Sequence, residues 1–593
     1  MSGKRQPRKD SSRYIVLLTL FVLAFTAIAS RLAWIQVVKA PEYSAQATAQ
    51  RLKDIELAPR RGTIYDREGE PLAVSVEAKT VFASPIDIED KDAAAAALAR
   101  TLGGDEDAYL EKIEGDSGFV YIERKVDLDR ASELEKLLER EKIEGVGFID
   151  DFRRIYPSGD LACQILGFVG VDDEGLAGLE RQYEGVLGGT PGVVLGERDP
   201  RQRPIPGGIQ KVIEPVHGGD VVLTIDKDIQ HRAQVELAKV VKKWGAKSAS
   251  AVVMNPRNGE IYAMATAPGF DPNKYGEAKA DRVRNKPLTD AYEPGSTLKT
   301  LTAAAVIEEK LYTPESKFDL PSTIKVGGRT IHEAHGRAAV RWTLTDIVTN
   351  SSNVGTVKLG LKLGKEGLYD SFAAFGLTEA PSTDFPGTTR GWLPPTDQWS
   401  ASSIGNIPFG QGVSVTSAQL ARAVGAIANE GVLTTPHFLL ALPASDAEPK
   451  AWPVRRAVSK ETAHDVNQML QAVVTEGTGS SAAVSGYTVA GKTGTAQKAR
   501  SDGKGYSGGG YVGSFVGFLP ADDPQVLVIV TVDRPTNAIY GGVVAGPTFS
   551  KLAQFSVSHL KIPPSSLEAS ESAAPDDGPG SGVGPVSDDE AFD

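Results

Sequence analysis

The sequence predicts an α+β fold, with an antiparallel sheet and helices, attached to a single N-terminal membrane helix. Two observations lead to this prediction. Residues 14–30 form an uncharged apolar run that continues, after Arg31, to residue 38, which is about the length of a helix that spans a bilayer. In residues 216–564, blocks with helical periodicity and blocks with strand-like alternation intermix, as is typical of an α+β domain.

The charges that precede the apolar run predict its orientation. The first 13 residues carry five basic side chains against the single acidic Asp10, and a basic flank stays in the cytoplasm. We therefore expect a cytoplasmic tail at residues 1–13, a transmembrane anchor at residues 14–38, and the remaining chain on the periplasmic side of the cytoplasmic membrane. The alternatives are a cleaved signal peptide and a buried core helix. The length of the apolar run and the lack of a convincing cleavage site favour a permanent anchor.

The composition and residue pattern of the chain change twice beyond the anchor. In residues 40–215, short strand-like and helix-like patterns are mixed with many charges and interrupted by Gly and Pro, which indicates an elongated, irregular region rather than a compact catalytic domain. A second domain is expected at residues 216–564. Residues 565–593 carry eight acidic side chains and no basic one, so we predict a disordered acidic tail.

Within the second domain, local patterns predict the elements of the sheet. Asp226 is a capping residue before a helical pattern that extends to residue 241. Apolar runs bounded by turn residues predict two pairs of adjacent strands, at residues 248–254 with 260–265 and at residues 511–519 with 525–533.

Composition argues against several kinds of function. The formal net charge of −12 argues against a nucleic-acid partner, because phosphate binding needs clustered Lys and Arg. Cys163 is the only cysteine, so no intramolecular disulfide can form, and we expect it to be a small buried residue. His332 and His335 lack the spacing that places two ligands one helical turn apart. We therefore expect loop or surface histidines, no metal site and no cofactor.

Ser296 and Lys299 form the first candidate catalytic pair. A Pro-Gly turn precedes Ser296, and the composition from Thr297 onward favours a helix, so Ser296 should lie at a helix N-terminus with Lys299 on the same face. A serine hydroxyl becomes an effective nucleophile when a base removes its proton, and a lysine with a lowered pKa can be that base. Taken alone, the pattern also fits a simple helix cap.

A second Ser-x-x-Lys pattern occurs at Ser322 and Lys325. It lies in a β-branched stretch flanked by glycine, which is typical of a strand. Residues three apart on a strand point to opposite faces, so we discard this pair.

Two further motifs carry candidate functional side chains. Ser351 and Asn353 form a Ser-x-Asn unit after a helical pattern that begins at Trp342; the serine could relay a proton and the amide could bind a peptide group. Lys-Thr-Gly-Thr follows a strand-like run, with the side chains Lys492, Thr493 and Thr495 around Gly494. These hydroxyls and the cation could bind a carboxylate, and a glycine within a strand marks close approach of a ligand or backbone. In isolation, each motif also fits a polar turn or an edge strand.

Together, Ser-x-x-Lys, Ser-x-Asn and Lys-Thr-Gly occur in the order found in penicillin-binding proteins and serine β-lactamases, with Ser-Ser-Asn here in place of Ser-Asp-Asn. The chain resembles class B penicillin-binding proteins well beyond this trio, in residues 61–73, 175–183, 220–226, 267–273 and 409–421. The segments 540–549 and 560–564 resemble the division (FtsI-like) type more than the cell-elongation type.

The resemblance implies a fold and an activity. Residues 40–215 would be an elongated non-catalytic pedestal of the dimerisation type, and residues 216–564 a transpeptidase domain like that of penicillin-binding proteins and serine β-lactamases. The activity would be that of a peptidoglycan D,D-transpeptidase, which cross-links stem peptides during septal wall synthesis through a serine acyl-enzyme and is inhibited by β-lactams. Implied partners are stem peptides, lipid-linked precursor strands, a SEDS-type (FtsW-like) glycan polymerase and divisome proteins.

The resemblance also implies a role for each site residue. Ser296 would attack the penultimate D-Ala carbonyl, with Lys299 as base and Ser351 as proton shuttle to the leaving amine. Asn353 would hold the substrate amide, and Lys492, Thr493 and Thr495 the terminal carboxylate. The backbone N–H groups of Ser296 and Thr495 would form the oxyanion hole.

Proteins with other functions share these motifs. An elongation-type transpeptidase would use the same site, and a D,D-carboxypeptidase or β-lactamase would resolve the acyl-enzyme with water. A penicillin sensor or non-catalytic division scaffold would use the domain for binding; the intact trio and the very short cytoplasmic tail argue against these two.

Overall fold

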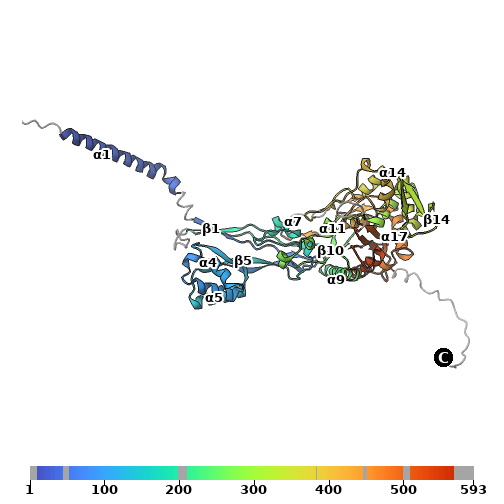
Figure 1. Cartoon of the computed structure of the whole chain (residues 1–593), viewed down its shortest axis with the longest axis horizontal. Helices are drawn as coiled ribbons and strands as arrows, with labels where there is room; N and C mark the ends of the chain where they lie inside the picture. The colour runs from blue at the N-terminus through green and yellow to red at the C-terminus, as the bar shows by residue number, and fades with distance from the viewer. Residues whose placement is uncertain are drawn as a thin grey trace, which may run out of the picture. The chain divides into compact units, whose positions relative to one another are not determined.

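The computed structural model describes residues 10–44, 52–197, 210–381, 384–444, 451–498, 506 and 508–565. The chain folds into two compact units, and each unit is assembled from separate stretches (Figure 1). The first unit contains Met1–Arg61, Ser75–Arg153 and Gly188–Gly218, and the second contains Gly62–Val74, Arg154–Leu187 and Gly219–Asp593. Thus two stretches that precede the expected boundary at 215/216 fold with the second unit. The two units are defined by compactness and not by function. The predicted limits of the pedestal and of the transpeptidase domain therefore stay a prediction.

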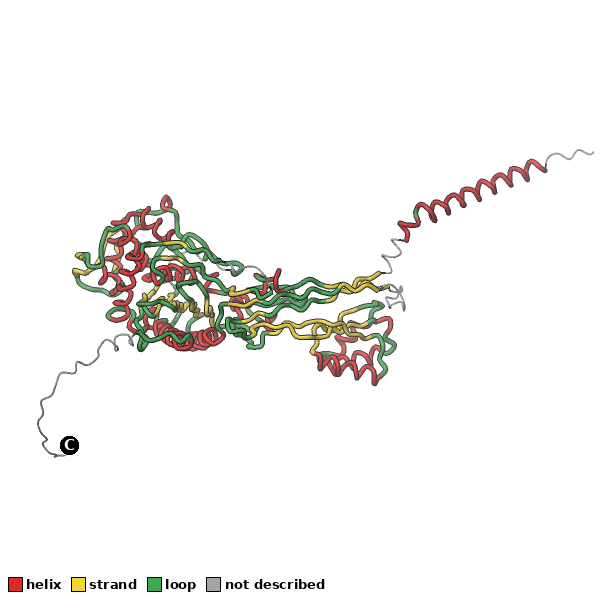
Figure 2. Tube along the Cα trace, turned by 180° about the vertical axis from the view of Figure 1, so that it is seen from behind, coloured by secondary structure: helices red, strands yellow, loops and turns green. Residues whose placement is uncertain are grey.

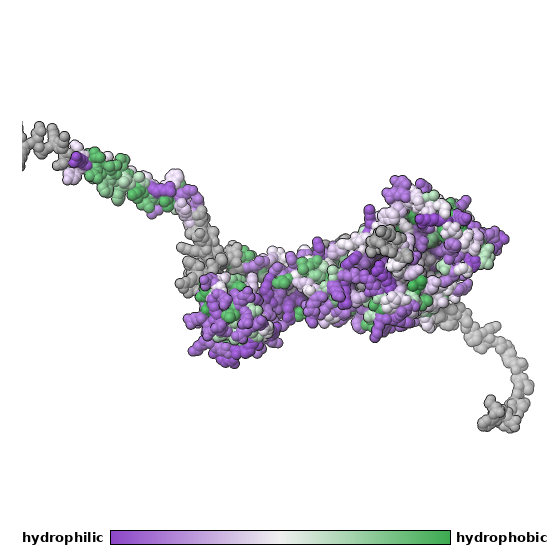
Figure 3. Space-filling view, in the orientation of Figure 1, coloured by the Kyte–Doolittle hydropathy of each residue, from purple (hydrophilic) through white to green (hydrophobic). Residues whose placement is uncertain are grey.

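The N-terminal helix consists of α1 (Asp10–Ala33) and a π-helical turn, η1 (Trp34–Val38). Residues Ser12–Val38 form 27 residues of apolar helix whose most apolar stretch has no buried contact, and its hydrophobic side chains are seen in Figure 3. At 1.5 Å per residue the helix is about 40 Å long, longer than a hydrocarbon core of ~30 Å. Within the described part of the chain it is the one candidate membrane span. The acidic tail predicted at residues 565–593 lies outside the described residues except for Ser565.

The first unit contains two groups of strands, shown in yellow in Figure 2. One group is an antiparallel three-stranded sheet in the order β1-β6-β7, formed by β1 (Leu52–Leu57), β6 (Gly192–Glu197) and β7 (Gln210–Ile213). The other contains the later part of β3 (Pro71–Ala83) with β4 (Val120–Asp127) and β5 (Val146–Ile155). Its core includes side chains of α3 (Lys91–Leu102), α4 (Glu106–Ile113) and α5 (Leu128–Glu141), and the short helix η2 (Pro85–Asp87) precedes α3.

A buried ion pair explains why two early stretches belong to the second unit. Arg154 Nε lies 2.7 Å from Glu180 Oε1, with side chains 1% and 0% exposed, and Arg154 also donates to the Gly62 carbonyl at 2.7 Å. Breaking such a pair leaves an uncompensated buried charge. These contacts therefore join the stretches around residues 62, 154 and 180. The same region includes β2 (Ile64–Tyr65), α6 (Cys163–Leu166), α7 (Gly178–Gln182) and α8 (Glu184–Leu187).

Cys163 at the start of α6 is fully buried, which confirms the expectation of a small buried residue. Burial raises the pKa of its thiol to about 12, so the reactive thiolate is disfavoured.

A five-stranded antiparallel sheet forms the centre of the second unit. Its strand order is β10-β9-β20-β19-β18, made by β9 (Ser248–Met254), β10 (Ile261–Ala267), β18 (Ala490–Gln497), β19 (Tyr511–Leu519) and β20 (Val526–Asp533). The two predicted strand pairs are confirmed, with shifts of one or two residues at the ends of β10 and β20. The α+β class is confirmed as well.

Helices cover both faces of this sheet because successive side chains of a strand point to opposite sides. Val253 and Val528 face a core shared with α9 (Lys227–Trp244) and α19 (Gly546–His559). Val252 and Ile529 face a second core, which contains α12 (Lys299–Glu308), α13 (Leu344–Thr349), α14 (Asn353–Ala374), α16 (Ser417–Ala428) and α17 (Lys460–Thr475). As predicted, Asp226 caps α9, and its carboxylate accepts the N–H groups of residues 228 and 229.

The remaining elements of the second unit are short. They include the strands that contain Lys325 and Trp342. The discarded Lys325 lies on strand β12, as predicted, and its side chain is exposed. The helical pattern predicted from Trp342 begins two residues later, because Trp342 pairs with Phe318 as part of a strand. The strands are β8 (Val221–Leu223), β11 (Lys317–Leu320), β12 (Thr323–Val326), β13 (Arg329–His332), β14 (Val340–Thr343), β15 (Val432–Leu433), β16 (Leu439–Ala441) and β17 (Arg455–Arg456). The short helices are η3 (Pro272–Glu277), α10 (Ala280–Val283), α11 (Lys286–Thr289), η4 (Gly295–Leu298), η5 (Thr396–Gln398), α15 (Ser403–Asn406), η6 (Ile407–Phe409), η7 (Ser480–Ala482) and α18 (Gly541–Val544).

Candidate active site

Ser296 lies in the 3₁₀ turn η4, and α12 begins at Lys299. The sequence predicted an α-helix from Thr297; the structure places a tighter turn there, in which side chains three residues apart are eclipsed. Ser296 is therefore aligned with Lys299 along the turn. Gly295 has φ +56°, and a Cβ at this position would lie only 3.0 Å from the Thr495 carbonyl oxygen. Glycine thus allows the serine turn to approach β18.

Lys299 is buried, with 1% of its surface exposed. Its Nζ donates to the Ser351 carbonyl at 2.5 Å, to Asn353 Oδ1 at 2.7 Å and to Ser351 Oγ at 3.3 Å. Burial, and secondly the cation of Lys492, hold the pKa of Lys299 well below its usual range, while Glu333 acts in the opposite direction. A lysine with a lowered pKa is more often neutral, so it can accept a proton from a serine hydroxyl.

The Ser-x-Asn segment connects α13 to α14. Ser351 has φ +56°, a left-handed conformation that costs a non-glycine residue about 1–2 kcal/mol. This backbone places the Ser351 hydroxyl 3.3 Å from Lys299 Nζ and 3.0 Å from Lys492 Nζ. Ser352 caps α14, and its Oγ accepts the Gly355 N–H at 2.9 Å. Ser351 therefore bridges the two lysines, as a proton relay requires.

Strand β18 contributes the Lys-Thr-Gly-Thr segment. Lys492 is 1% exposed, and burial lowers its pKa to about 7. The hydroxyl of Thr493 lies 2.9 Å from that of Thr478, and Thr495 Oγ1 accepts the Gly541 N–H at 3.0 Å. A cation and hydroxyls on one strand can bind a carboxylate.

Gly494 explains how β18 comes so close to the serine turn. A Cβ at this position would lie 2.3 Å from Ser514 Oγ and 2.8 Å from Thr297 Cγ2. Any side chain would therefore push β18 away from the turn that carries Ser296. The glycine is needed for the geometry of the site rather than for an unusual backbone angle.

The structure thus brings the three predicted motifs together in the second unit, linked through Lys299, Ser351 and Lys492. Sequence reasoning missed two nearby residues, Thr478 and Glu333. Thr478 follows α17 in a Gly-rich stretch, where nothing local marks it. Glu333 stands between the two histidines that we interpreted only as an unsuitable metal motif. The sequence shows only that Glu333 is an acidic residue in a polar loop. Its burial, which would have marked it as functional, is not visible in the sequence.

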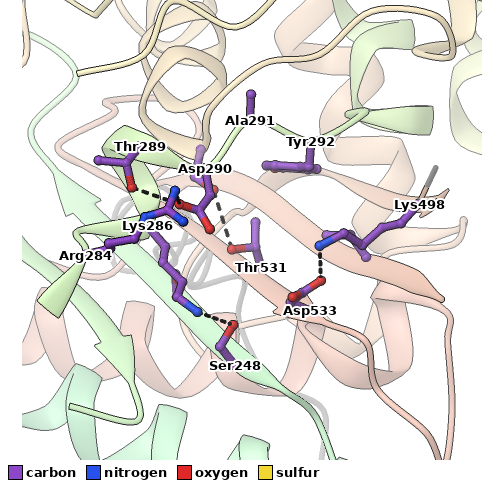
Figure 4. Close-up of a pocket in the computed structure, with 13 residues that line it drawn as sticks. Ser248, Arg284, Lys286, Thr289, Asp290, Ala291, Tyr292, Lys498, Thr531 and Asp533 are labelled. Carbon is purple, nitrogen blue, oxygen red and sulfur yellow. Dashed lines mark hydrogen bonds and ion pairs between the residues drawn. The ribbon is translucent and has the colours of Figure 1, made fainter. Parts of the chain in front are cut away.

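A separate polar cavity of about 250 Å³ lies at one end of the sheet (Figure 4). None of the predicted site residues lines it. Its charged side chains already have partners: Lys498 lies 2.5 Å from Asp533, Arg284 2.5 Å from Asp290, and Lys286 3.0 Å from Asp281. A charged ligand would have to compete with these pairs, so this cavity does not replace the lysine and serine cluster as the candidate site.

Family models match both parts of the chain. Residues 249–554 match the penicillin binding protein transpeptidase domain, and residues 56–223 match the penicillin-binding protein dimerisation domain. The first match contains all eight predicted site residues.

Known proteins resemble the chain over nearly its whole length. It is 35% identical to the "Probable peptidoglycan D,D-transpeptidase PbpC" of Pseudomonas aeruginosa, over 97% of this chain and 99% of that relative. It is 30% identical to the peptidoglycan D,D-transpeptidase FtsI of Escherichia coli, over 94% and 93%. Among solved structures, penicillin binding protein 3 of Mycobacterium tuberculosis complexed with aztreonam is 31% identical with a TM-score of 0.67, covering 86% of this chain and 98% of that one.

Proposed function

The chain belongs to the class B penicillin-binding proteins, and from this we propose that it cross-links peptidoglycan at the division septum through an acyl-enzyme on Ser296. Its enzyme class is that of the serine D-Ala-D-Ala transpeptidases. The observation that carries the mechanism is the hydrogen-bonded cluster in which the Ser351 hydroxyl lies within 3.3 Å of Lys299 Nζ and 3.0 Å of Lys492 Nζ.

Binding of the donor peptide uses the open side of β18. Within the described residues this strand pairs only with β19, so its other edge is available to an extended peptide. The terminal carboxylate of the donor binds Lys492, Thr493 and Thr495, and the Asn353 side chain holds the preceding amide. The scissile carbonyl oxygen then lies at the backbone N–H groups of Ser296 and Thr495, which stabilise the oxyanion as it develops.

Acylation begins when Ser296 Oγ attacks the penultimate D-Ala carbonyl and its proton passes to the neutral amine of Lys299. The C–N bond to the terminal D-Ala breaks, and Ser351 relays a proton from Lys299 to the leaving nitrogen. Free D-Ala departs, and the donor stem remains as an ester of Ser296. An amine of a second stem then attacks this ester, forms the cross-linking amide and returns a proton to Ser296.

The first test is acylation by penicillin, which follows the same chemistry but leaves no small fragment. Full-length protein in detergent is incubated with penicillin and its intact mass is measured. We expect one stable adduct. After trypsin digestion it should lie on the peptide of residues 285–299, since Lys286 precedes a proline, and fragmentation should place it on Ser296. An adduct at another residue would contradict the mechanism, and penicillin hydrolysis without a lasting adduct would favour a β-lactamase.

The septal assignment rests on the resemblance of residues 540–549 and 560–564 to the division type and on the likeness to FtsI. In the native cell, depletion of this protein should block division and give filaments of normal width. Rounded cells that still divide would instead favour the elongation type.

The basic residues before α1 support a cytoplasmic N-terminus and a periplasmic catalytic domain. At that location the substrates are stem peptides of lipid-linked precursor strands. By family, the partners are a SEDS-type (FtsW-like) glycan polymerase and divisome proteins.

A further inference from the structure

Glu333 lies between β13 and β14, next to the Ser-x-Asn segment, and its side chain is only 5% exposed. One carboxylate oxygen, Oε2, accepts the Asn353 N–H at 2.6 Å. The other, Oε1, accepts the Ser352 hydroxyl at 2.6 Å. Both contacts are to residues immediately after Ser351, at the first turn of α14. A carboxylate at this end of a helix also interacts favourably with the helix dipole.

Arg337 neutralises the buried carboxylate. Its NH2 group lies 2.5 Å from Glu333 Oε1, and its guanidinium lies over the Trp342 ring, 4.7 Å from the centroid. A buried carboxylate is tolerated when it is paired and hydrogen-bonded. The pairing with Arg337 makes the contacts to Ser352 and Asn353 part of a charged network, and charge-assisted hydrogen bonds are stronger than neutral ones.

The contacts of Glu333 act on the strained part of the site. Ser351 has φ +56°, and such a conformation persists only where the surroundings determine it. On one side, Lys299 holds the Ser351 carbonyl at 2.5 Å. On the other, Glu333 holds the next two residues, while the Asn353 side chain donates to the His332 carbonyl at 2.9 Å and accepts from Lys299 at 2.7 Å.

We propose that Glu333 is a positioning residue for acylation: its carboxylate fixes Ser352 and Asn353, so that the Ser351 hydroxyl stays in place between Lys299 and Lys492 and the Asn353 amide stays beside Lys299. This inference rests on the proposed function. Glu333 reaches the reacting atoms only through the Ser-x-Asn segment and takes no proton itself.

Glu333 has a second, electrostatic effect that provides a distinctive readout. The charged groups that act on the pKa of Lys299 are Lys492 on β18, which together with burial lowers it, and Glu333, which raises it. Removing the negative charge of Glu333 should therefore lower the pKa of Lys299 further. The acylation rate falls in acid because protonation removes the neutral amine that is the base. This fall, the acidic limb of the pH–rate profile, should then move to lower pH.

The test compares full-length wild type with Glu333→Gln, using a fluorescent penicillin to follow acylation from pH 5 to 9. Glutamine keeps the size of the side chain but has only one acceptor oxygen. We expect acylation near neutral pH to slow about 30-fold, since misplacement by 1 Å can cost about 10²-fold. The acidic limb should also shift to lower pH. Glu366→Gln removes the charge of an exposed carboxylate on α14, the helix whose first turn Glu333 contacts, and should leave both the rate and its pH dependence unchanged.

Conservative replacement separates positioning from general destabilisation. Glu333→Asp keeps the charge and can retain one of the two hydrogen bonds, so it should react faster than Glu333→Gln and show the wild-type acidic limb. If Glu333→Gln does not fold, Ser352→Ala removes one arm of the same contact and should also slow acylation.

The outcomes distinguish this inference from the function on which it rests. If wild type is acylated and Glu333→Gln (or, when that variant is unfolded, Ser352→Ala) reacts at the wild-type rate, the role of Glu333 is overturned and the transpeptidase mechanism stands. A slower rate with an unmoved acidic limb would overturn the electrostatic part. If wild type forms no adduct, both the proposed function and this inference fail.

Discussion

We expect the Lys299→Met variant to be acylated by penicillin roughly 10²- to 10⁴-fold more slowly than wild type, the range that a general base contributes. Lys299 is 1% exposed, so the apolar methionine side chain fits its surroundings without leaving a buried charge. Ser296 would keep its place in the 3₁₀ turn but would lose the group that takes its proton. The rate is measured from the growth of the fluorescent penicillin adduct on full-length protein.

Lys325 provides a matched control for this loss. It belongs to the other Ser-x-x-Lys pattern, on the exposed side of β12, and Lys325→Met should react like wild type. A Lys299→Met protein that melts at the wild-type temperature and still reacts within a factor of three of wild type would show that another group removes the proton.

The pH dependence of the wild type follows from the same lysine. Burial and the cation of Lys492 lower the pKa of Lys299. The neutral amine of Lys299 therefore exists at pH values at which an ordinary lysine is already fully protonated. Acylation should therefore rise with pH through this lowered pKa, and do so at a lower pH than an ordinary lysine base would allow. In Lys299→Met the rise should disappear, because the titrating group is gone.

Local patterns predicted the sheet and the order of the motifs. Strands β9 and β19 have the predicted residue bounds, because a strand buried on both faces reads as an apolar run that ends where turn residues begin. The helix cap at Asp226 was equally visible, since the capping residue and the helical pattern are adjacent in sequence. The trio Ser296, Ser351 and Lys492 could be proposed because each motif is short and self-contained.

Long-range contacts account for what the sequence did not reveal. The stretches 62–74 and 154–187 fold with the second unit through partners such as the buried Arg154 and Glu180, and no local pattern indicates which distant residue an arginine will meet. Glu333 has the same property: its partners Ser352 and Asn353 are 19 and 20 residues away. Even the turn at Ser296 is shaped by β18, because the backbone there passes close to Gly295.

Replacing Lys492 with methionine should reduce the acylation efficiency roughly 10²- to 10³-fold, the cost of removing one charge-stabilising donor from an active site. Two separate effects contribute. The carboxylate of the penicillin loses its cation, which weakens binding and orientation. The cation also lowers the pKa of Lys299, so in its absence that pKa should rise and the acidic limb should move to higher pH, opposite to the shift expected for Glu333→Gln.

The pH of the experiment decides how large the second effect is. Burial lowers the pKa of Lys492 to about 7, so its charge acts on Lys299 fully below pH 7 and fades above it. The difference between wild type and Lys492→Met should therefore be largest in acid and shrink as pH rises, because above pH 7 the wild-type lysine loses the charge that both lowers the pKa of Lys299 and binds the carboxylate. Lys498→Met, just beyond the end of the same strand and paired with Asp533, is the matched control and should follow the wild-type profile. A Lys492→Met protein whose acylation rate rises over the same acidic pH range as that of wild type would assign Lys492 to carboxylate binding alone and leave burial as the main cause of the lowered pKa of Lys299.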